Sequence, residues 1–374
     1  MPQIIQVRVK PAEAAADLFL KQLISQHKGV PLSSIQGFVI LKKSIDARGK
    51  TTWVNLTLQA FINEPTEIRP LRTFSFKDVS KAPKQVIIIG AGPAGLFAAL
   101  RLLEAGIKPI ILERGKDVRA RRRDLAAMNR EGVVNPDSNY CFGEGGAGTY
   151  SDGKLYTRSQ KRGDVNRILE LFVRFGADER ILYESHPHIG TNKLPHVITK
   201  MREAILEFGG EIHFEQCINE LKIIDGKLTA VRTKQGNSFS GHAFILATGH
   251  SARDIFELLH RNKLAIEAKS FALGVRVEHP QQLIDRTQYH CETRDPFLPP
   301  AAYSWVEQVN GKGVFSFCMC PGGIIAPAAT APGELVVNGW SPSKRNNPYA
   351  NSGIVVSVDM ADVRKKNNLQ DPLA

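Results

Sequence analysis

Residues 84–115 read KQVIIIGAGPAGLFAALRLLEAGIKPIILERG. Residues 86–89 are apolar and rich in isoleucine, which is typical of a buried parallel strand. A GxGxxG turn follows at residues 90–95, and a run of helix-forming residues comes after it. Residues 107–112 predict a second strand that ends at Glu113. Strand, glycine turn, helix and second strand together predict a Rossmann-like dinucleotide-binding unit.

Each position of the glycine turn has a physical task. Gly90 permits the tight turn, Gly92 lets the backbone approach a pyrophosphate, and Gly95 lets helix and strand pack closely. Pro93 and Ala94 lie in the first helical turn, where free N–H groups and the helix dipole favour phosphate. These five residues are therefore candidate cofactor contacts.

The acid at the end of the second strand is a further candidate. Glu113 follows Gly95 by eighteen residues, the spacing at which an acid accepts hydrogen bonds from ribose hydroxyls. A carboxylate there disfavours the 2′-phosphate of NADP at this turn. Arg114, the next residue, is added to the candidate contacts.

A β-meander and an apolar strand occur later in the chain. Residues 221–248 predict strands separated by glycine-containing turns, and residues 247–249 read Ala-Thr-Gly. This pattern resembles the family of flavoproteins with two dinucleotide-binding domains. In that family the Ala-Thr-Gly strand end lies near the bound flavin nucleotide, which makes Thr248 and Gly249 candidate FAD contacts. The alternative is that Gly249 only ends the strand.

A second glycine-rich segment, residues 139–157, reads NYCFGEGGAGTYSDGKLYT. Its lysine lacks the frame of a Walker A loop. Crowded glycines let a backbone lie against a flat or phosphorylated ligand. The candidate cofactor contacts in this segment are Gly145, Gly146, Gly148 and Thr149.

Lys154 and Asp152 of the same segment are the candidate catalytic residues. A cation beside the pyrimidine edge of a flavin stabilises the anionic reduced form, and this is the role predicted for Lys154. Asp152 is its predicted polar partner. The alternative is a surface loop with a solvated lysine.

Seven strings along the chain are informative as a set: KKSIDAR, FGEGGAGTYSDGKL, HIGTNKL, ILATGHSARD, FALGVRVEHP, FSFCMCPGG and ANSGIVVSV. Together they resemble the bacterial FAD-dependent, or NAD(FAD)-utilising, dehydrogenases. The resemblance implies bound FAD and oxidoreductase activity, but no particular substrate. Family members usually continue into another glycine-rich C-terminal segment. We therefore expect either a truncated product or a second polypeptide that supplies this segment.

The composition suits a folded protein: of 374 residues, 43% are hydrophobic and 23% charged. The net charge of +12 permits a polyanionic partner such as nucleic acid, but no nucleic-acid signature is present. Five cysteines in no disulfide pattern indicate a reducing compartment. The first residues predict a strand, and the uncharged residues 313–333 contain prolines that suit no membrane helix. We expect a cytoplasmic protein without a membrane segment.

The predicted fold class is α/β, with five segments. Residues 1–80 are expected to form a small ferredoxin-like α/β domain that ends in a polar linker. A Rossmann-like FAD-binding domain is expected to be discontinuous, over residues 81–160 and 210–260. Residues 161–209 are predicted as a helical insertion. Residues 261–374 are predicted as a partial mixed α+β substrate domain, truncated at its C-terminus.

Other polar residues are predicted to have structural roles. Residues 251–254 fit a capping box, and the basic run at residues 119–123 fits a solvated helix face. On a strand, Cys318 and Cys320 would face the same side. Two packed thiols are favoured there over a redox disulfide or a soft-metal site. The histidines of residues 186–188 lack metal-ligand spacing, and no metal is expected.

The residues and the resemblance together predict an FAD-dependent oxidoreductase that transfers hydride through flavin. A small molecule is the expected substrate, and NAD(P)H is a candidate electron donor, although the chain has no second GxGxxG turn. Two other classes stay open. One is a flavin-dependent RNA-modifying enzyme, and the other is a non-catalytic FAD-binding protein or inactive fragment.

Overall fold

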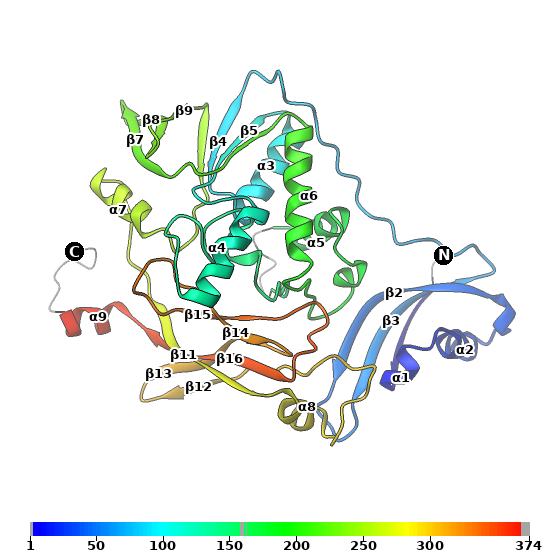
Figure 1. The fold of residues 1–374 in the computed structure, drawn as a ribbon. Helices are drawn as coiled ribbons and strands as arrows, with labels where there is room; N and C mark the ends of the chain where they lie inside the picture. The colour runs from blue at the N-terminus through cyan, green and yellow to red at the C-terminus, as the bar shows by residue number, and fades with distance from the viewer. Residues whose placement is uncertain (1–2, 158–160, 162, 368–374) are drawn as a thin grey trace.

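The N-terminal part of the chain folds as a small antiparallel sheet with helices on one face (Figure 1). The computed structural model describes residues 3–157, 161 and 163–367. The N-terminal elements are β1 (Gln3–Val9), α1 (Pro11–Ala14), α2 (Asp17–Lys28), η1 (Leu32–Ser34), β2 (Ile35–Asp46) and β3 (Trp53–Ile62). The strand order is β1-β3-β2. Leu20 and Ile24 of α2 are buried against Ile5 and Leu58 of the sheet. The β-α-β-β order is the one predicted from the sequence.

Residues 63–83 run from this sheet to the next strand without forming a helix or strand (Figure 1). The expected linker was polar, but Phe74 and Phe76 are buried in the main core. The ring of Phe76 stacks on Phe175 with centroids 6.5 Å apart, and meets Phe208 edge-on at 5.6 Å. Aromatic packing therefore attaches this segment to the larger part of the protein.

A parallel sheet forms the centre of the protein. Its elements are β4 (Gln85–Ile89), α3 (Pro93–Ala105), β5 (Lys108–Leu112), β6 (Glu211–His213) and β10 (Ala243–Leu246). The strand order is β10-β4-β5-β6, with all neighbours parallel. Ile88 and Ile111 belong to one core, and Ile87 and Ile110 to a second. Burial on both faces explains why these strands are continuously apolar.

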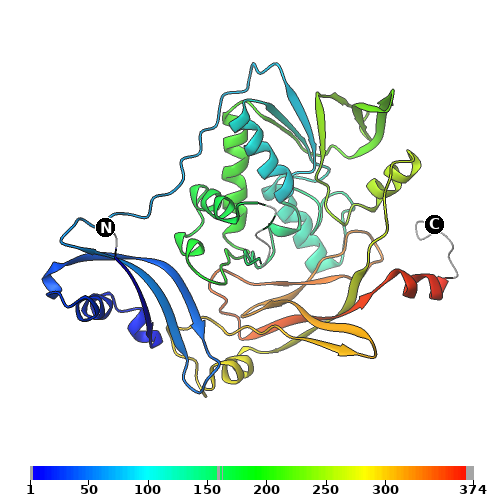
Figure 2. The same cartoon turned by 180° about the vertical axis from the view of Figure 1, so that it is seen from behind.

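Helices cover one face of the parallel sheet, and a small antiparallel sheet lies on the other. The helical elements are α4 (Val118–Glu131), η2 (Gly146–Gly148), α5 (Val165–Arg174), η3 (Glu179–Leu182) and α6 (Leu194–Glu207). Figures 1 and 2 both show α6 beside α3. The opposite face carries β7 (Ile218–Ile224), β8 (Lys227–Thr233), β9 (Ser238–Ser240) and α7 (Arg253–Arg261). Ile198 and Met201 of α6 share the core of Ile88, so the predicted insertion packs as part of this unit.

The last part of the chain forms a second layer beneath the parallel sheet (Figure 1). Its elements are β11 (Phe271–Pro280), α8 (Gln281–Tyr289), β12 (Val306–Val309), β13 (Lys312–Cys320), β14 (Ile324–Pro327), β15 (Val337–Trp340), β16 (Tyr349–Val358) and α9 (Met360–Asn367). An antiparallel sheet has the order β11-β16-β13-β12, and β14 pairs with β15. Strands were predicted at residues 271–277 and 314–319, and both are present. No helix of the described residues is long and apolar enough to cross a membrane.

Candidate functional site

A cavity of about 480 Å³ lies at the carboxyl ends of β4, β5 and β10. Ligands of open α/β sheets bind at this end of the strands, and the volume is in the usual range for a ligand site. Ten of the thirteen predicted cofactor residues line the cavity: Gly90, Gly92, Pro93, Ala94, Glu113, Arg114, Gly146, Gly148, Thr248 and Gly249. The structure thus brings together residues that the sequence spreads over about 160 positions.

The three glycines of the first turn differ in what surrounds them. Gly90 has a φ of +109°, and a Cβ there would lie 2.5 Å from the carbonyl oxygen of Ala247. A Cβ on Gly95 would collide with the carbonyl oxygen of Gly90. A Cβ on Gly92 would meet only the Cα of Gly146, 4.0 Å away. The space in front of Gly92 is therefore open to a ligand.

The N-terminus of α3 begins at this open space. Gly92 is the N-cap, and no side chain caps the first turn. Pro93 follows as the first helical residue and has no N–H to satisfy. The remaining free N–H groups and the positive end of the helix dipole favour an anion. This end of the cavity suits a phosphate or pyrophosphate group.

Glu113 connects the glycine-rich segments. Its side chain is buried, and its carboxylate accepts hydrogen bonds from three backbone N–H groups, those of Ala91 (2.8 Å), Gly115 (2.8 Å) and Gly143 (2.9 Å). Oε1 accepts two of these bonds and Oε2 accepts one, so Oε2 keeps a free acceptor position. The structural role was not foreseen from the sequence. The ribose contact stays a prediction.

Arg121 corrects the prediction of a solvated basic run. Its side chain is fully buried beneath the second glycine-rich segment. The guanidinium donates to the carbonyl oxygens of Asn139 (2.8 Å), Glu144 (2.7 Å), Tyr140 (2.6 Å) and Gly146 (2.9 Å). Burial lowers its pKa, and the charge of Glu113 counteracts part of that effect. The arginine thus fixes the loop that lines the cavity.

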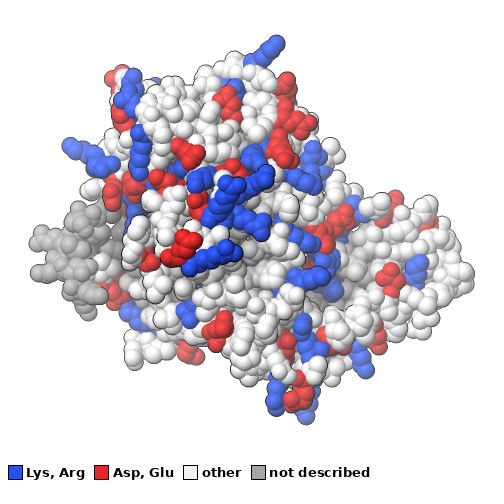
Figure 3. Space-filling model, viewed as in Figure 1, with Lys and Arg blue, Asp and Glu red and all other residues white. Residues whose placement is uncertain are grey.

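The other arginines of the run are exposed as predicted. Arg119, Arg122 and Arg123 lie on the outer side of α4. Figure 3 shows Lys and Arg side chains gathered on the face that carries this helix. The basic surface and the buried loop anchor therefore come from one short stretch of sequence.

Three predicted cofactor residues lie behind the cavity lining. Gly95 packs against the turn, and a Cβ on Gly145 would collide with the hydroxyl of Thr149. Thr149 is fully buried, and its hydroxyl donates to the carbonyl oxygen of Glu144 at 2.9 Å. These three residues therefore fix the backbone of the two glycine-rich segments behind the cavity.

Arg114 and Asp254 meet at the cavity wall. Arg114 pairs with Asp254 at 2.9 Å and with Asp137 at 2.7 Å, and its guanidinium lies over the ring of Phe142. The predicted capping box at residues 251–254 is wrong. Helix α7 has Ala252 as its N-cap, without a side-chain cap bond. The Asp254 carboxylate, which was predicted to take part in the capping box, instead forms an ion pair with Arg114.

Sequence reasoning did not identify several residues of the cavity wall. They are Cys141, Phe142, Gln216, Cys217, Ile218, Ala252 and Asp254. Burial raises the pKa of the thiols of Cys141 and Cys217. Both thiols are therefore protonated at neutral pH, which suits packing rather than nucleophilic chemistry. No local motif marks these positions, because they reach the cavity from separate loops.

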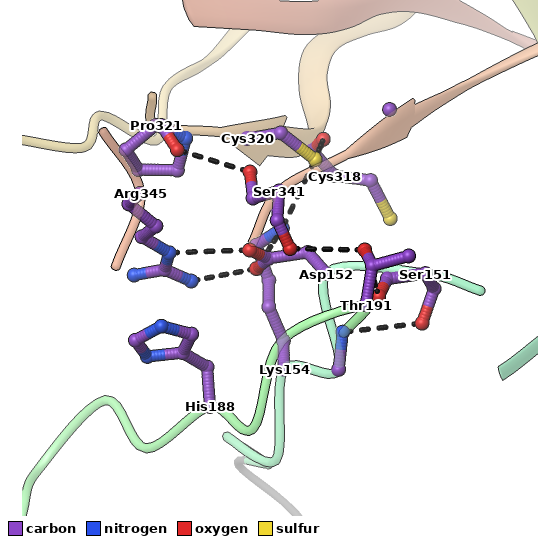
Figure 4. Close-up of polar contacts among 12 residues, drawn as sticks. Ser151, Asp152, Lys154, His188, Thr191, Cys318, Cys320, Pro321, Ser341 and Arg345 are labelled. Atoms are coloured by element: carbon purple, nitrogen blue, oxygen red, sulfur yellow. Dashed lines mark hydrogen bonds and ion pairs between the residues drawn. The ribbon is translucent and has the colours of Figure 1, made fainter. Parts of the chain in front are cut away.

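Lys154 and Asp152 lie outside the cavity lining, in a polar cluster with Arg345 (Figure 4). The Asp152 carboxylate accepts hydrogen bonds from Nε and Nη2 of Arg345 at 3.1 and 2.6 Å. Nζ of Lys154 lies 2.9 Å from its Oδ2. Burial alone raises the pKa of Asp152, but the charges of Arg345 and Lys154 outweigh it and hold the pKa at about 2. Asp152 is thus an ionised partner of two cations. The predicted flavin-tuning role of Lys154 stays a prediction.

His188 belongs to the same cluster as a neutral side chain. Burial, together with the charge of Arg345, lowers its pKa to about 4. Its Nε2 lies 3.1 Å from the carbonyl oxygen of Ser343, which can only accept, so Nε2 carries the proton. Among the described residues, no group of three or more His, Cys, Asp and Glu side chains could hold a metal ion.

Cys318 and Cys320 do not face the same side, contrary to the prediction. The register of β13 against β16 shifts between Phe317 and Cys320, and Cys318 has a φ of +46°. This bulge breaks the alternation of the strand. Cys318 is exposed, whereas Cys320 is buried with its Sγ 3.4 Å from Nζ of Lys154. Two thiols packed against each other are therefore not found.

Comparison with known protein families identifies three matching domains. An FAD binding domain matches residues 84–128, and the C-terminal domain-like family of FAD-dependent proteins matches residues 270–373. A domain of unknown function, DUF8436, matches residues 1–61. A Clostridium beijerinckii protein that bears only the name "Uncharacterized protein" is 37% identical over 368 residues. The match covers 94% of this chain and 68% of that protein.

Solved structures match this chain at low identity and low TM-score. FqzB is 14% identical with a TM-score of 0.34, over 76% of this chain and 55% of that one. BrvH, a flavin-dependent halogenase from Brevundimonas sp. BAL3, is 13% identical with a TM-score of 0.32, over 76% and 58%. CtdE, solved in complex with FAD, is 12% identical with a TM-score of 0.30, over 73% and 58%. This chain thus spans between half and two thirds of each of these structures.

Proposed function

We propose that this chain, which belongs to the same family as its Clostridium beijerinckii relative, is an FAD-dependent dehydrogenase. FAD is its cofactor, as the matching FAD-binding and FAD-dependent domains indicate. When bound, FAD supplies hydride transfer, while the protein supplies orientation and electrostatics. A small molecule is the proposed substrate.

One observation supports this function above the others. The uncapped N-terminus of α3 and the open space at Gly92 meet at the carboxyl end of the parallel sheet. In this proposal the first turn of α3 holds the pyrophosphate, and the free acceptor position of Glu113 takes a ribose hydroxyl. Thr248 and Gly249, at the end of the neighbouring strand β10, line the same cavity.

We propose NADH or NADPH as the electron donor, and an anaerobic absorbance experiment tests it. The purified chain, loaded with FAD, is expected to show a flavin band that bleaches when one of the two nucleotides is added. The bleaching would establish the reductive half-reaction and name the donor. A band that persists with both nucleotides would contradict this donor and favour another donor or a non-catalytic FAD-binding protein.

Gly92→Ala is expected to weaken FAD binding at least tenfold without lowering the Tm of the apoprotein. The added methyl group meets no protein atom closer than 4.0 Å, so it enters the space assigned to the pyrophosphate. Tenfold corresponds to about 1.4 kcal/mol. Fluorescence titration with FAD and thermal unfolding measure the two quantities.

The matched control is Gly49→Ala. A Cβ at Gly49 would have no atom within 4 Å, and this residue lies far along the chain from those that line the cavity. It is expected to bind FAD like the wild type. Gly95→Ala is expected to lose the folded protein itself, because its methyl group collides with the turn. Wild-type FAD affinity in Gly92→Ala would refute the placement of the pyrophosphate.

An RNA substrate is the second candidate. The exposed Arg119, Arg122 and Arg123 on α4 support it, together with the basic surface in Figure 3. Binding of this kind weakens steeply with salt, because phosphate contacts release counterions.

A further inference from the structure

The polar cluster of Figure 4 carries more positive than negative charge. Lys154 and Arg345 share the single carboxylate of Asp152. A third cation, Arg276 of β11, has no carboxylate partner within ion-pair distance among the residues that the structure describes. Its guanidinium donates to Oδ1 of Asn351 at 2.7 Å and to the carbonyl oxygen of Cys318 at 2.8 Å. Among the described residues, Asp152 is the one carboxylate within ion-pair distance of these three cations, so the cluster carries excess positive charge.

A glycine makes room for this arrangement. A Cβ on Gly339 would lie 2.6 Å from Nη1 of Arg276, from Oδ1 of Asn351 and from Sγ of Cys320. The φ of Gly339 is not in the left-handed region, so the backbone does not require glycine at this position. The missing side chain instead lets the guanidinium approach the thiol that also contacts Lys154.

The cluster also contains an unmet hydrogen-bond donor. Asn351 is fully buried, and its Nδ2 has no partner within the described chain. Its Oδ1 is occupied by Arg276, so the side chain cannot satisfy itself by turning over. Buried donors normally have acceptors.

The cations remain accessible. The side chain of Lys154 is 36% exposed, Arg276 is partly exposed, and Cys318 between them is exposed. Cys318 holds a φ of +46°, a conformation that costs energy in a residue with a side chain. This conformation turns the Cys318 carbonyl toward Arg276.

The cluster adjoins the cofactor cavity. Tyr140 precedes Cys141 of the cavity lining and stacks on Trp340, with ring centroids 6.2 Å apart. Trp340 follows Gly339 directly in the chain. On the other side, the hydroxyl of Ser151 donates to the carbonyl oxygen of Gly148, which also lines the cavity. The cations thus lie one layer of side chains beyond the proposed FAD site.

We propose that Arg276 and Lys154 bind a carboxylate group of the substrate, which makes the substrate an organic acid. This inference rests on the proposed flavoenzyme function. Asn351 and Cys318 engage both N–H groups of Nη1 and one of Nη2, so the Nε and Nη2 edge of Arg276 is the part that matches the two oxygens of a carboxylate. Lys154 adds a second charge. Asp152 and Arg345 hold Lys154 in place from the buried side. A phosphate of a nicotinamide nucleotide has similar chemistry, and the experiment separates the two.

The test uses the FAD-loaded protein and two probes, succinate and inorganic phosphate, titrated calorimetrically at constant ionic strength. Succinate is expected to bind saturably. Arg276→Gln is expected to weaken it at least tenfold, and Arg276→Lys replaces this variant if it fails to fold. The matched control is Arg286→Gln, an exposed arginine on α8 that is expected to bind succinate like the wild type.

A local readout accompanies the titration. Succinate is expected to slow alkylation of Cys318 by iodoacetamide in the wild type and in Arg286→Gln, but not in the Arg276 variants. Saturable binding of phosphate but not of succinate would overturn the organic-acid substrate. Absence of binding in a protein that keeps its flavin band would overturn the inference and leave the flavoenzyme intact. Failure to take up FAD would refute the proposed function itself, and the substrate role with it.

Discussion

Arg121→Met is expected to lower the free energy of unfolding by more than about 4 kcal/mol and to abolish measurable FAD binding. Methionine fits the helix about as well as arginine, so the loss comes from the hydrogen bonds. The carbonyl oxygens of Asn139, Tyr140, Glu144 and Gly146 lose their donor in a buried setting. Each such loss costs about 1–3 kcal/mol. Their loop lines the cavity, so binding fails with it.

Denaturant unfolding and FAD titration measure both effects of Arg121→Met. Arg121→Lys keeps a charge but not the fork that reaches four carbonyls, and it is expected to recover only part of the stability. Arg122→Met, one residue along the helix and exposed, is the matched control and is expected to change stability by less than about 0.5 kcal/mol. An Arg121→Met protein with wild-type stability and FAD affinity would contradict the anchoring role.

The burial of Arg121 had a signal in the sequence that charge alone concealed. Val118, Arg121, Leu125 and Met128 are the buried residues of α4. They follow one another at intervals of three, four and three, which is the stripe of one helix face. The interpretation of residues 119–123 as one solvated basic run overlooked this periodicity. The structural tasks of Gly90 and Gly95 in the turn at residues 90–95 were correctly predicted, because local backbone geometry sets them.

Other features of the site had no local signal. The bulge at Cys318 depends on how β13 pairs with β16, and nothing in the string FSFCMC marks a left-handed residue. Asp254 is the right residue type for a helix cap, but Arg114 holds its carboxylate from 140 positions away. Tertiary ion pairs override local preferences in this way, and they depend on topology rather than on neighbouring residues.

Asp152→Asn is expected to lower the free energy of unfolding by about 3–5 kcal/mol at neutral pH. The Asp152 side chain is 3% exposed and that of Arg345 is 11% exposed. Removing one partner of a buried pair leaves the other charge uncompensated, and Lys154 loses its carboxylate too. Chemical denaturation measures the loss. Glu220→Gln, which breaks an ion pair with Arg232 exposed on both sides, is the control and is expected to cost less than about 1 kcal/mol.

The pH dependence gives the same pair an independent test. The pKa of Asp152 is held at about 2 in the folded protein, against a usual value of 3.8. Between these values the unfolded chain binds the proton more readily, so the stability from Asp152 is complete above about pH 4 and is lost as the pH falls toward 2. This part amounts to about 2 kcal/mol. The difference in stability between wild type and Asp152→Asn should therefore shrink over that window, and a constant difference would contradict the ion pair.

A double variant separates structure from chemistry at Asp152. Arg345→Gln removes the other buried charge of the pair. The double variant Asp152→Asn/Arg345→Gln is expected to lose less stability than the sum of the two single losses, because neither partner of the pair is left as an unpaired charge. If Asp152 only positions Lys154, the double variant is expected to regain stability. Its Kd for succinate is expected to differ from that of the wild type, because Lys154 has lost its carboxylate partner. If Asp152 instead acted directly on the substrate, Asp152→Asn would slow turnover, and the double variant would stay as slow although its stability is restored.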